Sequence, residues 1–177
     1  MKKILLALGL VVLATGATMA QEQGQINAKA GLALGTKASV DDDGDAKMGL
    51  GINLGGEYFF TDAISIAPTY TLFFPTKIGE TKIIPSVLNL DGRYYFNANG
   101  LSLYGTAGLA VQSVKVKWEG DSDTGNLTTF NLGAGILYPL ADKISLDGQL
   151  KLMGGDEDET FDGAQFVLSA GISYRIK

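Results

Sequence analysis

The sequence predicts an all-β fold: an eight-stranded antiparallel up-and-down transmembrane β-barrel, preceded by a signal peptide. Three observations support this prediction. Eight segments alternate apolar residues with polar or small ones. Each is close to the roughly 9–11 residues that a tilted strand needs to cross a bilayer. The connections alternate between long and short. Strands of soluble sheets usually have nearer five or six residues, so the segment length favours a membrane protein.

Residues 1–20 have the pattern of a secretory signal peptide. Lys2 and Lys3 precede the apolar segment 4–13, and the small residues Thr18 and Ala20 precede Gln21. A membrane-anchor helix is the alternative, but the apolar segment is too short for one. We therefore expect a signal peptide at 1–20 and a single barrel domain at 21–177.

The alternation is clear in the first segment, where Ile26 and Leu32 share one face and Asn27 and Lys29 share the other. The segments are 25–36, 47–60, 64–74, 86–96, one that begins at residue 101, 127–138, 143–153 and 164–176.

Two segments depart from the pattern. Pro68, in the third, cannot donate a hydrogen bond to a neighbouring strand. In the fifth, the apolar residues change from odd to even positions after Val111. This change predicts either a β-bulge near Gln112 or Ser113, or a strand that is already clear of the membrane. The apolar residues after the change are Val114, Val116 and Trp118.

The connections indicate which end of the barrel faces outward. The long ones are 37–46, 75–85, 119–126 and 154–163, and the short ones are 61–63, 97–100 and 139–142. Outer-membrane barrels have long external loops and short periplasmic turns, and an even number of strands leaves both termini in the periplasm.

Aromatic residues near the strand ends predict two belts at the headgroup boundaries. Those at the short-turn ends are Tyr58, Phe59, Phe60, Tyr94, Tyr95, Phe96, Tyr138 and Tyr174. Those near the long-loop ends are Phe73, Phe74, Trp118, Phe161 and Phe166.

With this pattern, residues 21–177 resemble the small OmpA/OmpX-like outer-membrane β-barrel proteins of Gram-negative bacteria. The resemblance implies an outer-membrane location with extracellular loops. It also implies contact with outer-membrane lipid and lipopolysaccharide, and with the barrel-assembly machinery. The last strand is similar to the family's assembly signal, although the chain ends in Lys177 rather than in an aromatic residue. The matching residues are Ser169, Gly171, Tyr174 and Ile176. We expect a monomer.

Composition argues against several other classes of protein. The chain has no cysteine and no histidine, which removes thiol chemistry and the histidine on which enzymes among outer-membrane barrels rely. We therefore expect neither an enzyme nor a cofactor. Loss of the two leader lysines changes the net charge from −5 to −7, so nucleic acid is not an expected partner.

The candidate site is the barrel interior, where charged residues on the polar faces should meet. An eight-stranded barrel is just wide enough for side chains to fill it, so we expect these charges to pair. The alternative is a narrow ion path or gate among Arg93, Lys151 and the acidic residues. The predicted network comprises Lys29, Glu57, Asp91, Arg93, Asp147, Lys151 and Arg175.

The long loops contain clusters of carboxylates, which can bind calcium through oxygen ligands. The EF-hand spacing is not met, and a solvated acidic surface is the simpler interpretation. Divalent cations bridging these loops to lipopolysaccharide phosphates are a further hypothesis. The candidate metal ligands are Asp41, Asp43, Asp45, Asp156 and Asp158.

The favoured function is a non-catalytic structural role, or an interaction through loops at the cell surface. A narrow channel or carrier for a small solute is the first alternative. A soluble, secreted, lipocalin-like barrel that binds an apolar ligand is the second. Alternation alone cannot say which face lies inside; strand length, aromatic belts and loop asymmetry favour the membrane.

Overall fold

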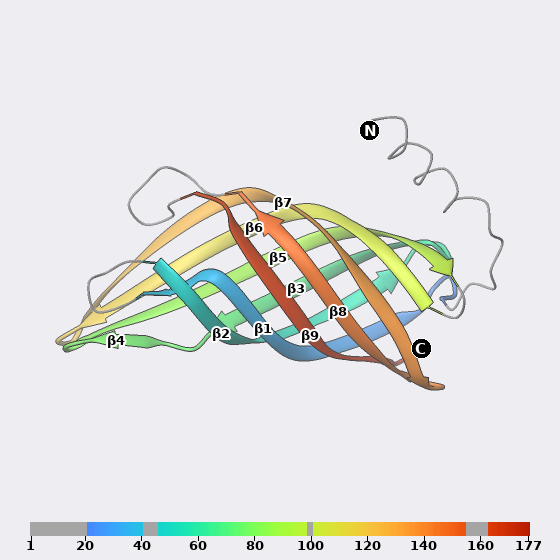
Figure 1. Ribbon diagram of the computed structural model, residues 1–177, viewed down its shortest axis with the longest axis horizontal. Helices are drawn as coiled ribbons and strands as arrows, with labels where there is room; N and C mark the ends of the chain where they lie inside the picture. Colours follow the sequence, from blue (N-terminus) through green and yellow to red (C-terminus); the bar gives the residue numbers. More distant parts are fainter. Residues whose placement is uncertain (1–20, 41–45, 99–100, 155–162) are drawn as a thin grey trace.

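The computed structural model describes residues 21–40, 46–98, 101–154 and 163–177, which form one antiparallel sheet closed into a barrel (Figure 1). The predicted signal peptide lies outside these residues and stays a prediction. Across the ranges described, no helix is long and apolar enough to cross a membrane. The strands are β1 (Ile26–Val40), β2 (Ala46–Phe59), β3 (Ile64–Phe73), β4 (Thr76–Ile78), β5 (Thr81–Ala98), β6 (Leu101–Trp118), β7 (Asp121–Ala141), β8 (Ile144–Met153) and β9 (Gln165–Arg175).

Eight of these nine strands form the barrel wall, which confirms the predicted fold. β3 pairs with β5, and β1 pairs with β9 to close the sheet. The short β4 pairs only with the start of β5, as part of a hairpin outside the ring. The β2–β3 and β7–β8 turns and the C-terminus lie at one end of the barrel, the short-turn end, and the β4–β5 and β6–β7 hairpins lie at the other, the long-loop end (Figure 1).

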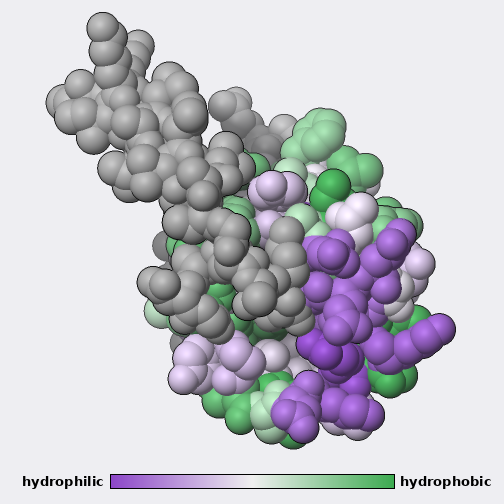
Figure 2. Space-filling model, turned by 90° about the vertical axis from the view of Figure 1, so that its right-hand side faces the viewer, coloured by the Kyte–Doolittle hydropathy of each residue, from purple (hydrophilic) through white to green (hydrophobic). Residues whose placement is uncertain are grey.

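The barrel is polar inside and apolar outside, as alternation on a transmembrane barrel requires. Along β1, Asn27 and Lys29 are buried, whereas Leu32 is 55% exposed. On β7, Phe130 is 80% exposed. Seen from the short-turn end, hydrophilic residues gather in one area with apolar residues along its margin (Figure 2). A soluble barrel has the reverse arrangement, so the lipocalin-like alternative is wrong.

Two of the predicted long loops are mostly strand. β5 has 18 residues and β7 has 21, well above the predicted lengths, whereas β6 (18 residues) fills the predicted space between 101 and the connection that begins at 119. Consequently 75–85 is the β4–β5 hairpin, which turns at Gly79 with φ 59°. The segment 119–126 belongs to the β6–β7 hairpin, which turns at Glu119 and Gly120 with φ 27° and 89°. Positive φ at both residues suits the tight turn of a twisted hairpin. Both hairpins project beyond the barrel wall (Figure 1).

Of the two alternatives predicted for the fifth segment, the β-bulge near Gln112 or Ser113 is absent, which leaves a strand that continues past the barrel wall. β6 keeps one continuous register with β5 and with β7, from one end of its paired residues to the other. Even-numbered residues of β6 face inward, so Val114 and Val116 continue the lumen-facing side. The strand therefore passes beyond the barrel wall without a shift, and its apolar residues change face where the hairpin begins.

Irregularities occur at other places in the wall. The β1–β2 register shifts between Gly35 and Ser39, and the β7–β8 register shifts between Pro139 and Ala141. Pro68 pairs with β5, but the β2–β3 ladder is interrupted beside it, as its missing N–H requires.

Three aromatic residues assigned to the belts point into the barrel instead. Phe59, Tyr95 and Phe73 are at most 1% exposed. Adjacent residues on a strand face opposite sides, so only one of two neighbouring aromatics can reach lipid. Their neighbours Tyr58, Tyr94 and Phe74 are 42–48% exposed on the outside. Phe161 lies outside the described residues.

Candidate functional site

Inward-facing positions on four strands bring four predicted charges into one network at the middle of the lumen. The Lys29 ammonium lies 2.6 Å from a Glu57 carboxylate oxygen and 2.7 Å from an Asp147 oxygen. The Arg93 guanidinium approaches the same two oxygens at 3.5 and 3.6 Å. Two cations and two anions thus neutralise one another in a buried space. Such pairing offsets the cost of removing each charge from water.

A second ion pair lies farther toward the long-loop end. The Lys151 ammonium is 2.5 Å from Asp91, whose side chain is fully buried. The Asn131 amide donates to the other Asp91 oxygen at 2.8 Å and to Asn89 at 3.2 Å. The Asn131 amide thus adds a hydrogen bond to the carboxylate of this pair.

Hydroxyl groups add hydrogen bonds to the central network, and the sequence prediction missed them. The Tyr104 hydroxyl donates to Asp147 at 2.6 Å, and the Tyr95 and Ser65 hydroxyls both donate to Glu57 at 2.6 Å. The Arg93 guanidinium also lies 4.6 Å from the centre of the Tyr104 ring, within range of a cation–π interaction. The alternation along each strand could have revealed that both tyrosines point inward, since each lies between outward-facing residues.

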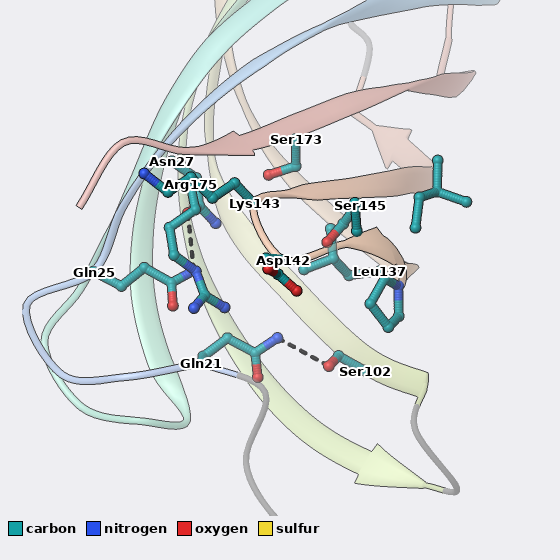
Figure 3. Close-up of a pocket in the computed structure, with 13 residues that line it drawn as sticks. Gln21, Gln25, Asn27, Ser102, Leu137, Asp142, Lys143, Ser145, Ser173 and Arg175 are labelled. Carbon is teal, nitrogen blue, oxygen red and sulfur yellow. Dashed lines mark hydrogen bonds between the residues drawn. The ribbon is translucent and has the colours of Figure 1, made fainter.

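Arg175 lies nearer the end of its strand than the other six predicted charges. It lines a cavity of about 340 Å³ at the short-turn mouth of the barrel (Figure 3). The same mouth holds a hydrogen bond of 2.9 Å from the Gln21 amide to the Ser102 hydroxyl, and one of 2.8 Å from Gln25 to Asn27. The seven charges predicted as one network therefore form a central group of four, one pair, and one residue at the mouth.

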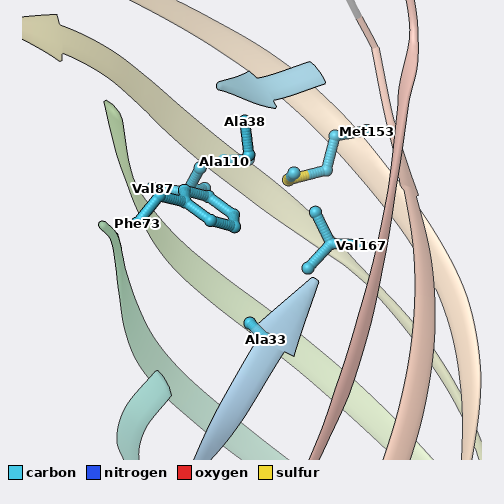
Figure 4. Close-up of a cluster of buried hydrophobic side chains, with 7 residues drawn as sticks. All are labelled: Ala33, Ala38, Phe73, Val87, Ala110, Met153 and Val167. Atoms are coloured by element: carbon cyan, nitrogen blue, oxygen red, sulfur yellow. The ribbon is translucent and has the colours of Figure 1, made fainter. Parts of the chain in front are cut away.

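Two clusters of buried residues close the lumen on either side of the ion pairs. Toward the short turns these are Phe59, Tyr95, Tyr104 and Leu137. Toward the long connections they are Ala33, Ala38, Phe73, Val87, Ala110, Met153 and Val167 (Figure 4). Two cavities beside the ion pairs measure only about 20 and 10 Å³, room for about one water molecule each. The interior is a packed core.

The remaining candidates lie elsewhere. The five acidic residues predicted as metal ligands fall outside the described residues. Within the part of the chain that is described, no group of three or more potential ligands could hold a metal ion. In the predicted assembly signal, Ser169 and Gly171 face the lumen, and Tyr174 faces outward. Ile176 follows the strand and is 57% exposed.

Comparison with known proteins bears directly on this architecture. Residues 5–175 match the outer membrane protein beta-barrel domain. The chain belongs to this family. Its members' architecture accounts for the apolar exterior, the polar interior and the closed ring of eight strands. The protein is thus an outer-membrane β-barrel.

Individual relatives agree with this assignment. Outer membrane porin F of Pseudomonas aeruginosa is 31% identical over 105 residues, which cover 54% of this chain and 30% of the relative. The chain therefore matches less than a third of that protein's length. Among solved structures, the N-terminal barrel domain of Pseudomonas aeruginosa OprF superposes with a TM-score of 0.64 at 21% identity, covering 88% of this chain and 100% of that one.

Two other barrels share the fold at similar identity. Neisserial surface protein A has a TM-score of 0.67 at 18% identity, covering 86% of this chain and 96% of that one. The attachment invasion locus protein Ail of Yersinia pestis has a TM-score of 0.61 at 21% identity, covering 87% and 99% respectively. At these identities the likeness shows the fold alone.

The Tyr104 hydroxyl provides a first test of the lumen network. Tyr104→Phe keeps the ring but removes the hydrogen bond to Asp147. We expect the free energy of unfolding to fall by about 1.5–3 kcal/mol, the usual range for a hydrogen bond to a charged group. Urea unfolding of protein refolded in lipid micelles measures the change. Tyr94→Phe, on the exposed outer face, is the matched control and should change stability by less than about 0.5 kcal/mol. Equal effects for the two variants would contradict the assigned role of Tyr104.

Proposed function

We propose that the protein is a non-catalytic outer-membrane scaffold that presents the β4–β5 and β6–β7 hairpins at the cell surface. The closed lumen is the observation that carries this proposal. Ion pairs cross the barrel at two levels, and packed clusters lie beyond them on both sides. A scaffold of this kind leaves the projecting hairpins as the surface available to partners.

The proposed orientation follows from the asymmetry of the two ends. Long connections are typically external in outer-membrane barrels and short turns periplasmic. The hairpins would then project from the cell, while Gln21 and the C-terminus lie in the periplasm. We propose a monomer that is inserted by the barrel-assembly machinery and surrounded by outer-membrane lipid and lipopolysaccharide.

The titles of related structures support a role at the surface. One neighbour is named a surface protein and another an attachment invasion locus protein. A structure of the latter contains the heparin analogue sucrose octasulfate. A contact role for the hairpins of this chain is a proposal by analogy with those proteins. Absence of histidine and cysteine from the sequence supports its non-catalytic part.

Conductance measurements test the closed lumen. We expect the refolded protein to give no stable single-channel steps in planar bilayers, because side chains fill the interior. The competing function is a narrow ion path. It is favoured by the name of the porin relative and by the longer distances of 3.5 and 3.6 Å at Arg93. Reproducible steps that disappear in Arg93→Ala would establish that path and overturn the closed scaffold.

A further inference from the structure

The two projecting hairpins carry four lysines on neighbouring strands, here called the lysine row: Lys77, Lys82, Lys115 and Lys117. The β4–β5 register places Lys77 opposite Lys82, and the β5–β6 register places Lys82 opposite Lys117. Cβ atoms of directly opposed residues lie about 4.5–5.5 Å apart, and like charges in such positions destabilise a sheet. Three adjacent ammonium groups therefore favour the binding of an anion.

The lysine row faces the same side of the sheet as the outer surface of the barrel. On β5, Leu88 is exposed on the outside and Val87 is buried, so alternation points Lys82 outward. The register carries this orientation to Lys77 and Lys117. On β6, Leu109 is exposed on the outside, so the other odd-numbered residues of this strand also point outward.

Neutral side chains flank the lysine row on β7. Lys117 is opposite Ser122, and Lys115 is opposite Thr124. The carboxylates of β7 alternate with these hydroxyl residues and so belong to the other face of the hairpin. Between the described residues, no ion pair joins a member of the lysine row to a carboxylate. The positive charge is therefore available to a ligand outside the chain.

The distance of the lysine row beyond the apolar band of the barrel places it at the level of lipid headgroups. Lys115 follows Val111, on the outer face of the barrel, by four residues, which span about 13 Å along a strand. A strand tilt of about 40° reduces this to roughly 10 Å along the membrane normal. The polar layer extends about 5–8 Å beyond the hydrocarbon on each side, and lysine side chains can reach back toward it.

We propose that the lysine row binds phosphate groups of lipopolysaccharide in the outer leaflet and so holds the hairpins against the membrane surface. Opposed positive charges, the outward face and the height above the apolar band all fit such a ligand. This inference rests on the proposed orientation, because only an external hairpin meets lipopolysaccharide.

Binding of lipid A to the refolded full chain in neutral detergent micelles tests the proposal. We expect native mass spectrometry to detect bound bisphosphorylated lipid A and at least tenfold weaker binding of the same lipid without its phosphates. Trp118, the single tryptophan of the chain, follows Lys117 directly in the sequence with its side chain on the opposite face of the strand, and its fluorescence gives a second readout. The triple variant K77Q/K82Q/K117Q should bind the bisphosphorylated lipid at least tenfold more weakly than the unmodified chain.

The control variant K47Q/K143Q/K177Q removes the same charge from exposed lysines outside the row and should change affinity less than twofold. Equal loss in both triple variants would overturn the proposal, because net charge alone would then explain binding. So would equal binding of the dephosphorylated lipid, or binding of soluble sucrose octasulfate without binding of lipid A. The assay in micelles does not depend on membrane orientation, so its failure is distinguishable from failure of the proposed function.

Discussion

Replacing Glu57 with alanine is expected to lower the free energy of unfolding by about 3–5 kcal/mol, the usual cost of removing one partner from a buried ion pair. Glu57 contacts Lys29 and Arg93, and it accepts hydrogen bonds from Ser65 and Tyr95. Its removal leaves two buried cations to share Asp147 and two hydroxyl groups without their acceptor. Urea unfolding in lipid micelles, followed by far-UV circular dichroism, measures the loss.

Two further variants make this expectation specific to charge. Glu57→Gln keeps the size of the side chain but removes the charge, so it should lose most of the same stability. Glu80→Ala removes an exposed carboxylate at a hairpin turn and should change stability by less than about 0.5 kcal/mol. A Glu57→Ala variant within 1 kcal/mol of the unmodified chain would show that this residue does not sustain the network.

The second large effect is expected at the seam between β1 and β9. Gly171 and Gly31 face each other there, and a Cβ atom on Gly171 would overlap the Ala30 carbonyl oxygen and lie 2.5 Å from the Gly31 Cα. The obstacle is backbone, which cannot rotate away. We expect Gly171→Val to lower the free energy of unfolding by about 3 kcal/mol or more, the upper end for an overpacked site.

Heat-modifiable gel mobility measures the effect of that substitution, because a folded barrel migrates differently before and after boiling. The folded band should be depleted in Gly171→Val and retained in Gly92→Val. The control makes the same glycine-to-valine change at a position that has room for a side chain. A Cβ atom on Gly92 approaches only the Ala107 carbonyl oxygen, at 3.7 Å. Equal folding of the two variants would mean that the seam is looser than the structure shows.

Alternation along single strands, together with strand length, the aromatic belts and the loop asymmetry, predicts the barrel and the inward position of its charges. Lys29, Glu57, Arg93 and Asp147 all fall on polar faces, so the sequence could group them. It could not pair them, because pairing depends on the stagger between strands and on closure of β1 against β9. For that reason Arg175 was predicted as part of the network but lies at the mouth.

The errors in the sequence prediction share a physical origin. The position of Tyr95 at a strand end predicts a lipid-facing belt residue, because strand-end aromatics usually favour headgroups, but its place in the alternation along β5 puts it in the lumen. The outward residues of the segments 75–85 and 119–126 are mostly polar, so the pattern along the sequence predicts loops there. Beyond the hydrocarbon no lipid selects an apolar exterior, so a strand can continue while its apolar residues change face. Val114 and Val116 mark this change on β6.

The central claim is that the chain is an outer-membrane barrel whose hairpins face outward and whose short turns face the periplasm. The chain has no cysteine, so Ser122→Cys and Asp142→Cys each provide one labelling site, near the β6–β7 turn and at the β7–β8 turn. A maleimide on a polymer too large to cross the outer membrane should label the Ser122→Cys variant on intact cells. It should label the Asp142→Cys variant only after the outer membrane is permeabilised. Labelling of the Asp142→Cys variant alone on intact cells, or of neither variant until permeabilisation, would contradict the account.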